Sequence, residues 1–225
     1  MIYYVCIGIL YFILTGFILI TSNVNEPLYA IKSILIPYNY ENNKIIFINL
    51  IINYSFIIIF IMDIIKKCGS AFSMQVYIQQ RCTKKKAYIK ILGKIFKSIG
   101  ILLIIKFIID IVLGGILTLE DFQFLLLFYV LYILTLLIWI LVILILYLCN
   151  FNEKKISFSM IALILIFQYL SFQISLLKIF VIASKDILYD INIIIILKII
   201  LISLLLIISY SKFKRYEIIG GLKND

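Results

Sequence analysis

Long apolar stretches alternate with short polar ones along the chain. Six stretches are free or nearly free of charged residues, and they cover residues 1–20, 45–65, 99–119, 124–148, 157–177 and 191–211. A helix needs about 20 apolar residues to cross a bilayer core that is about 30 Å thick. The pattern therefore predicts an all-α polytopic membrane protein, with six transmembrane helices in one domain that spans residues 1–225. The first stretch lacks a basic leading segment and a small-residue cleavage site, so we expect it to be retained as a helix.

Basic residues gather on one side of these six stretches. Fifteen of the 21 Lys and Arg residues lie in segments 66–98 and 150–156 or after residue 211. The opposite side has four Lys residues against six acidic residues. Because Lys and Arg favour the cytoplasmic side of a membrane, the fifteen are expected in the cytoplasm. The amino and carboxyl termini are then both cytoplasmic, which agrees with an even number of spans.

The composition excludes a water-soluble globule. The chain is 65% apolar and 14% charged, with a mean hydropathy of +1.19, whereas soluble domains are about 45–50% apolar and about 25% charged. It has 57 Ile residues, and 19 Lys against two Arg. This bias is typical of AT-rich genomes, so we expect the plasma membrane of a low-GC bacterium. In so apolar a chain the net charge of +10 indicates lysines that face anionic lipid, and not a nucleic-acid partner.

The chain lacks the residue patterns of most catalytic sites. It has no His, which is the commonest general base and metal ligand. None of the four Cys residues falls in an expected outer loop, and the glycines do not have the spacing of a phosphate-binding loop. The acid pairs Glu120–Asp121 and Asp186–Asp190 lie outside the expected spans, unlike an intramembrane protease dyad. We therefore expect no enzyme, and no catalytic residue, metal or cofactor.

The expected cytoplasmic loop, residues 66–98, combines polar, basic and amphipathic parts. Residues 70–81 are mixed in polarity, and the basic run Thr83–Lys86 follows them. Between residues 87 and 100, apolar positions recur at helical spacing, which predicts an amphipathic helix at the inner interface before the chain turns into the third span. Two interpretations are open. The lysines fix the topology and bind lipid, or residues 70–83 form a short helix that docks into a soluble subunit.

Two segments resemble the small six-helix permease subunits of ABC-2-type transporters. The stretch YIQQRCTKKKAYIKILGKIFKSIG is similar to the loop between the second and third helices of that family, with matching residue classes at Tyr77, Arg81, Thr83, Lys84, Lys85 and Tyr88. The carboxyl end, YSKFKRYEIIGG, is similar to the family's last segment at Tyr210, Lys212, Phe213, Lys214, Arg215, Glu217, Ile218 and Ile219. The six-helix layout matches over nearly the whole chain.

This resemblance implies a permease that forms a homodimer or pairs with a second permease. It also implies a separate ATPase subunit that hydrolyses ATP and drives export of, or immunity against, an amphipathic or apolar peptide or lipid-like compound. The residues that would dock this partner are Tyr77, Arg81, Thr83, Lys84, Lys85 and Lys86. The alternative is a non-catalytic membrane accessory or immunity protein without its own ATPase, which needs no motif.

A few polar residues lie inside the apolar stretches. Lys106 and Asp110 are four residues apart in the third span and can pair on one helix face. Lys198 in the sixth span is another candidate partner for Asp110. Because a buried ion costs about 2.5–3.5 kcal/mol on insertion scales, we favour a structural ion pair over a substrate or proton site. Gln168 and Gln173 in the fifth span are expected to bond between helices or to line a pathway.

Overall fold

The computed structural model describes residues 2–21, 31–32, 34–39, 44–73, 83–115, 118–182, 184 and 190–215. Its long elements are the α-helices α1 (Ile2–Thr21), α3 (Phe47–Ser73), α5 (Lys84–Gly114), α6 (Leu119–Leu148), α7 (Glu153–Ser171) and α8 (Ile191–Arg215). A 3₁₀ helix, η1 (Ser175–Phe180), follows α7, and two-residue strands β1 (Tyr38–Asn39) and β2 (Lys44–Ile45) pair antiparallel before α3. The all-α prediction is therefore confirmed, apart from this small hairpin.

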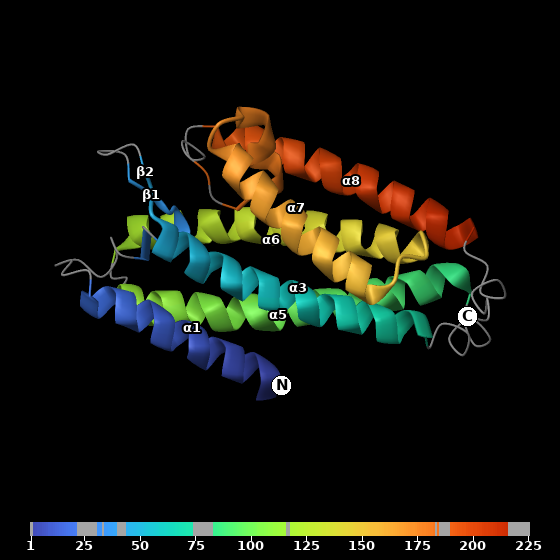
Figure 1. The fold of residues 1–225 in the computed structure, drawn as a ribbon, viewed down its shortest axis with the longest axis horizontal. Coiled ribbons are helices and arrows are strands. Elements are labelled where there is room, and N and C mark those ends of the chain that lie inside the picture. Colours follow the sequence, from blue (N-terminus) through green and yellow to red (C-terminus); the bar gives the residue numbers. More distant parts are fainter. Residues whose placement is uncertain are drawn as a thin grey trace.

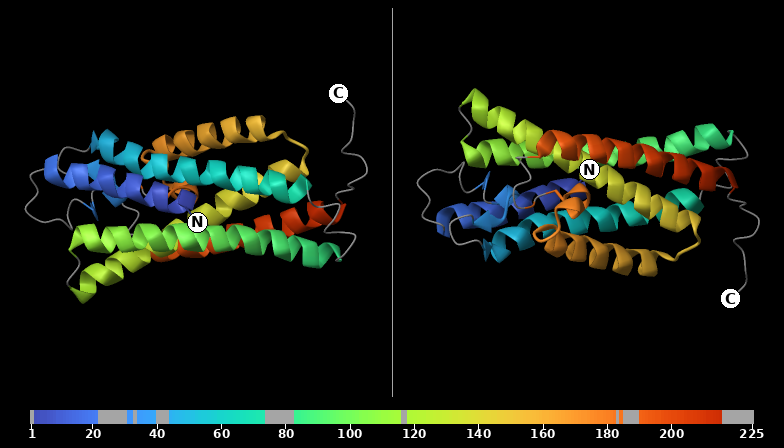
Figure 2. Two further views of the ribbon diagram at one scale, coloured as in Figure 1. Left: turned by 90° about the horizontal axis from the view of Figure 1, so that it is seen from below. Right: turned by 90° about the horizontal axis from the view of Figure 1, so that it is seen from above.

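The six α-helices run back and forth along one axis in chain order (Figure 1). The start of α1 points toward the end of the bundle at which α8 finishes. Figure 2 shows α3 and α7 on one side and α5 and α8 on the other, with α6 crossing obliquely between them. In line with this arrangement, α6 contacts α3, α7 and α8, while α1 packs mainly along α5. The central position of α6 matters for both polar sites described below.

Among the described residues, four helical segments are long and apolar enough to cross a membrane: Phe47–Ser70, Leu119–Leu148, Glu153–Ser171 and Ile191–Arg215. In α1 the apolar part, Val5–Ile20, is shorter. The apolar half of α5 carries Lys106 and Asp110, and its other half is basic. Large apolar side chains such as Phe17, Ile48 and Phe158 point outward, as expected where lipid is the solvent. The fold is thus that of a membrane-embedded helical bundle.

The cytoplasmic loop expected at 66–98 is largely helical. Helix α3 continues to Ser73, and α5 begins at Lys84 and passes Ile99 without a break. Thr83 caps α5, because its Oγ1 accepts a hydrogen bond from the backbone N–H of Lys86 at 3.4 Å. The expected turn between the amphipathic segment and the third span is therefore absent, and one helix of 31 residues, about 46 Å long, replaces the two.

Gly115 ends α5 in the left-handed conformation, with φ of 56°, which glycine adopts without strain. The pair Gly114–Gly115 thus terminates the helix and does not kink it.

The fifth span was expected at 157–177, whereas helix α7 covers Glu153–Ser171. Helix α7 stops at Ser171, where the N–H groups of Gln173 and Ile174 both bond to the carbonyl of Leu170 and tighten the last turn. The chain then folds back through η1. Val181 and Ile182 line the same small cavity as Ile164, which lies about two turns inside α7. Hydrophobicity could not mark this boundary because the segment after Ser171 is as apolar as the helix.

Gly8 of α1 packs closely against α5. A Cβ atom at this position would lie 2.7 Å from Cγ2 of Ile105, whereas a Cβ at Gly16 would have no atom within 4 Å. We predict that Gly8→Ala destabilises the protein by about 1–3 kcal/mol through overpacking. Gly16→Ala should leave stability unchanged or raise it, because alanine favours helices. Thermal unfolding in detergent measures both, and equal stabilities for the two variants would contradict the packing.

Candidate functional site

A buried ion pair lies in the apolar half of α5. Lys106 and Asp110 are both 0% exposed, and Nζ of Lys106 lies 2.7 Å from Oδ2 of Asp110. The pairing within the third predicted span is therefore formed, and Lys198 is not the partner of Asp110. The four-residue spacing places both side chains on one face of the helix.

Two tyrosines from other helices complete this pair. The hydroxyl of Tyr11 in α1 donates to Oδ1 of Asp110 at 2.9 Å, and that of Tyr129 in α6 donates to Oδ2 at 2.7 Å. The same Tyr11 oxygen accepts a hydrogen bond from Nζ of Lys106 at 2.8 Å. We call Lys106, Asp110, Tyr11 and Tyr129 the ionic cluster. It joins α1, α5 and α6 through charge-assisted hydrogen bonds, which are stronger than neutral ones.

Aromatic rings surround the ammonium group of the cluster. Its Nζ atom lies 4.5 Å from the ring centre of Tyr11, and 5.5 Å from those of Tyr129 and Tyr132. Ring faces attract cations at these distances. The hydroxyl of Tyr132 donates to Oδ1 of Asn53 at 3.3 Å, which extends the network to α3. The ammonium group of Lys106 has a counter-ion and several ring faces around it, and the carboxylate of Asp110 accepts three hydrogen bonds. Both charges are therefore satisfied within the protein, and the cluster holds helices together.

Lys198 forms a second buried site, on α8. Its Nζ donates to Oγ1 of Thr135 at 2.6 Å, to the carbonyl of Ile179 at 2.8 Å and to that of Val181 at 2.9 Å. An ammonium group has three donors, and all three are used here. We call residues 172–182 the fold-back segment. Lys198 holds this segment between α6 and α8 through these hydrogen bonds. Nε1 of Trp139 in α6 donates another hydrogen bond to the carbonyl of Phe180 at 3.0 Å.

The two candidate glutamines differ in their surroundings. Gln168 is buried in α7, and its Oε1 accepts a hydrogen bond from the hydroxyl of Tyr54 in α3, as expected for a side chain that links helices. Gln173 lies beyond the end of α7 and is exposed. The fifth span therefore does not present both glutamines on one buried face.

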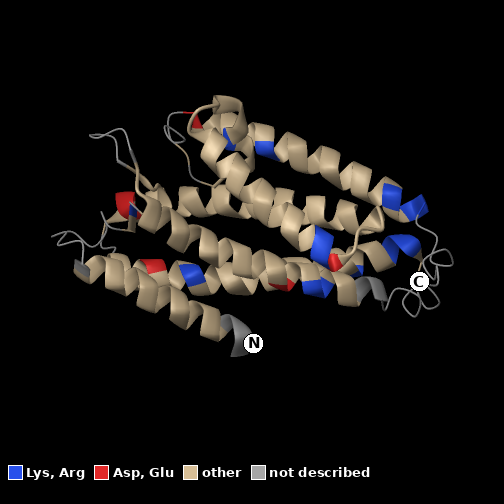
Figure 3. Cartoon of the chain, in the orientation of Figure 1, with Lys and Arg blue, Asp and Glu red and all other residues tan. Residues whose placement is uncertain are grey.

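Basic residues gather at the end of the bundle where α5 begins and α8 finishes (Figure 3). Of the docking candidates, Thr83, Lys84, Lys85 and Lys86 are exposed in the cap and first turn of α5. Tyr77 and Arg81 lie outside the described residues. The exposed lysines form a cationic surface at one tip of a long helix.

This tip is braced against α8. Nζ of Lys84 donates to the carbonyl of Lys214 at 3.0 Å, and the hydroxyls of Tyr88 and Ser209 lie 2.5 Å apart. The Tyr88 ring is also 5.2 Å from that of Phe213. Burial raises the pKa of Tyr88 above its ordinary value. The basic half of α5 and the last turns of α8 are therefore in direct contact.

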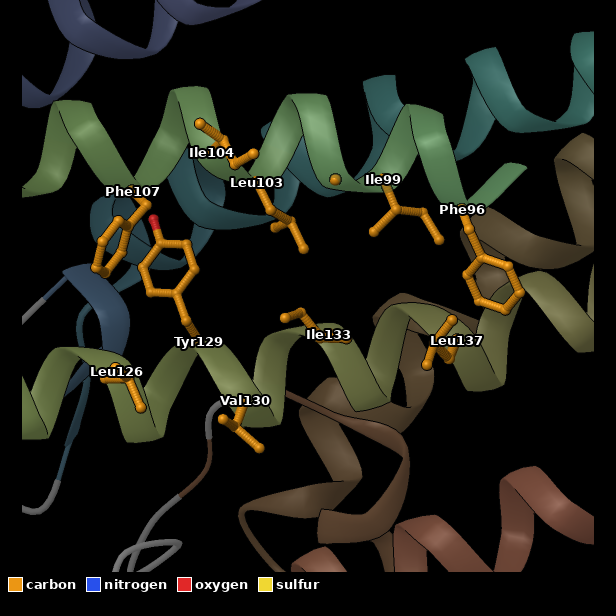
Figure 4. Close-up of a pocket in the computed structure, with 11 residues that line it drawn as sticks. Phe96, Ile99, Leu103, Ile104, Phe107, Leu126, Tyr129, Val130, Ile133 and Leu137 are labelled. Carbon is orange, nitrogen blue, oxygen red and sulfur yellow. The ribbon is translucent and has the colours of Figure 1, made fainter. Parts of the chain in front are cut away.

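An open apolar groove of about 390 Å³ separates parts of α5 and α6 (Figure 4). Phe96, Leu103 and Phe107 line one wall, and Tyr129 and Ile133 line the other. Tyr129 thus faces the groove with its ring while its hydroxyl bonds to Asp110. The groove runs beside the ionic cluster but exposes no charged side chain of it.

Sequence reasoning missed the tyrosines of the ionic cluster and Trp139. Lys and Asp stand out in an apolar helix because charge is rare there, whereas the chain has 16 Tyr residues in all settings. A weak signal existed in α6, where Tyr129, Tyr132, Thr135 and Trp139 recur every three or four residues and share a face. Of these, Thr135 links two helices, because its Oγ1 accepts a hydrogen bond from Nζ of Lys198 in α8.

Comparisons of the chain with family models, with curated proteins and with solved structures found no match. Within the described residues, no three His, Cys, Asp or Glu side chains come together to hold a metal ion.

Replacing Lys198 should loosen the fold-back segment. Lys198→Met leaves the carbonyl of Ile179 without its donor, and a buried unpaired polar group costs about 1–3 kcal/mol. Because Trp139 is the only tryptophan and bonds to Phe180, its fluorescence reports on this segment. We expect acrylamide to quench Trp139 fluorescence more strongly in Lys198→Met than in the wild type. Lys212→Met, a change at an exposed position of α8, should be quenched as the wild type is. Unchanged quenching in the first variant would mean that Lys198 does not hold the segment.

Proposed function

We propose that this chain is a membrane-spanning permease subunit of an ABC-type transporter, in the plasma membrane of a low-GC bacterium. In this proposal all six helices cross the bilayer, the basic end is cytoplasmic, and both termini lie there. A separate subunit hydrolyses ATP. The permease works as a homodimer or with a second permease, and it exports an amphipathic or apolar compound.

The observation that carries the proposal is the continuity of α5. Its exposed lysines, Lys84–Lys86, and its buried pair, Lys106 and Asp110, belong to one unbroken helix. Lys106 lies 20 positions after Lys86, a distance of about 30 Å along the helix at 1.5 Å per residue. A displacement of the cytoplasmic tip by a partner is thereby transmitted along a rigid rod to the residues that hold α1 and α6.

Contacts at the cytoplasmic tip support the same interpretation. The amphipathic part of α5 and the last turns of α8 meet through Tyr88, Ser209 and Phe213. These are parts of the two segments on which the resemblance to ABC-2 permeases rests. A partner that binds the exposed lysines would therefore move α5 and α8 together.

The interior suits an apolar cargo better than an ionic one. The groove between α5 and α6 is lined by Ile, Leu, Val and aromatic side chains, and the charges of the ionic cluster are already matched within the protein. No uncompensated anion or cation of that cluster faces the groove. We therefore assign the cluster to structure and coupling, and not to binding of a charged substrate.

Charge reversal at the tip of α5 tests the proposed coupling. Lys85→Glu/Lys86→Glu should reduce co-purification of the ATPase by more than tenfold, because close like charges across an interface cost several kcal/mol. Lys84 is left unchanged since it bonds to the carbonyl of Lys214. The measurement is pull-down of the tagged chain from its native host, with quantification of any nucleotide-binding subunit.

Lys154→Glu/Lys155→Glu is the matched control, because these exposed lysines open α7 at the same end of the bundle. It should leave co-purification unchanged. If the wild-type chain brings down no ATPase, the chain is an accessory or immunity protein that works without one. If an ATPase is present but the two double variants behave alike, the docking site lies elsewhere.

A further inference from the structure

A second hollow, of about 330 Å³, lies between the last turns of α3 and the basic half of α5. Its polar lining consists of three lysines and two serines: Lys67, Lys94, Lys97, Ser70 and Ser98. Its apolar lining consists of Ile91, Ile95 and Ile101. This hollow and the α5–α6 groove lie on different faces of α5 and share no residue. The two are therefore separate sites.

Positive charge dominates this hollow. Lys67 on its α3 side is paired with Asp63 at 2.6 Å and also donates to the hydroxyl of Ser98 at 3.0 Å. Asp63 offsets one of the three lysine charges. Lys94 and Lys97 are exposed and supply two more. The hollow is complementary to an anion through these lysines, because the hydroxyls of Ser70 and Ser98 already donate to the carbonyls of Lys67 and Lys94.

The position of the hollow along the helices is that of a membrane interface. Lys67 lies two residues after the apolar stretch 45–65, and Lys97 lies two residues before the apolar stretch 99–119. Charged side chains that border such stretches reach the level of lipid headgroups. Ile95 and Ile101 lie on the same lining as the lysines, so the hollow offers an apolar wall next to a cationic one. A free inorganic anion would make no favourable contact with the apolar side chains, whereas a lipid acyl chain would.

We propose that this hollow binds the phosphate group of an anionic phospholipid. Lys94 and Lys97 provide its charge complement and its hydrogen-bond donors, and the isoleucines contact the first carbons of an acyl chain. The site also separates the roles of the basic residues in segment 83–97. Lys94 and Lys97 hold lipid, whereas the lysines at the tip of α5 remain available to a partner. The assignment does not depend on an ATPase.

Native mass spectrometry of the full chain in detergent tests this site. Phosphatidylglycerol and phosphatidylcholine with identical acyl chains are titrated separately, and the first should bind more tightly. Lys94→Gln/Lys97→Gln should weaken phosphatidylglycerol binding by about 25-fold, since each lysine near an anionic lipid contributes about fivefold. Both side chains are exposed, so the thermal transition of this variant should match the wild type.

Lys154→Gln/Lys155→Gln is the matched control, with two exposed lysines at the same end of the bundle that do not line the hollow. Retained phosphatidylglycerol binding in this control, together with its loss in Lys94→Gln/Lys97→Gln, supports the site. Equal wild-type binding of the two lipids, or equal losses in the two variants, overturns it. Competition by soluble glycerol 3-phosphate at the lipid's own concentration would also overturn it, because the site would then bind free phosphate.

Discussion

The fold depends on keeping one ion pair out of contact with lipid. Lys106 and Asp110 lie in the apolar half of α5, and each charge alone would cost about 2.5–3.5 kcal/mol there on insertion scales. The protein offsets this cost by bringing Tyr11 and Tyr129 to the carboxylate and aromatic rings to the ammonium group. The need to enclose the pair therefore fixes where α1 and α6 must pack against α5.

Helix α6 connects this cluster to the other buried cation. Tyr129 and Tyr132 face the α5 pair, and Thr135 and Trp139, one to three turns further on, hold Lys198 and the fold-back segment. Lys198 has neutral acceptors only, so its three hydrogen bonds replace a counter-ion within the described residues. Lys106 is thus stabilised by a carboxylate and Lys198 by neutral oxygen atoms, and α6 contributes side chains to both sites.

The sequence was sufficient for the features that charge and hydrophobicity encode. It predicted an all-helical membrane bundle, and it predicted the pairing of Lys106 with Asp110 as one of two alternatives. It could not place the start of the fold-back at Ser171, because Lys198 holds this segment through carbonyl groups, which every residue has. It also divided α5 into an interfacial helix and a span, since the change from amphipathic to apolar pattern at Ile99 looks like a boundary although the backbone continues. Tyr11 was hidden because its partners are 95 and 99 residues away in the chain.

The most direct test of this account compares Asp110→Asn with Lys106→Met/Asp110→Asn by thermal unfolding in detergent. Removal of one partner of a buried pair leaves an uncompensated charge and costs about 3–5 kcal/mol, whereas removal of both charges is often nearly neutral. Asparagine retains an oxygen that can accept from Tyr11 or Tyr129. We predict a strongly destabilised single variant and a double variant that regains most of the loss. A double variant as unstable as the single one, or a single variant as stable as the wild type, would contradict the central role of this ion pair.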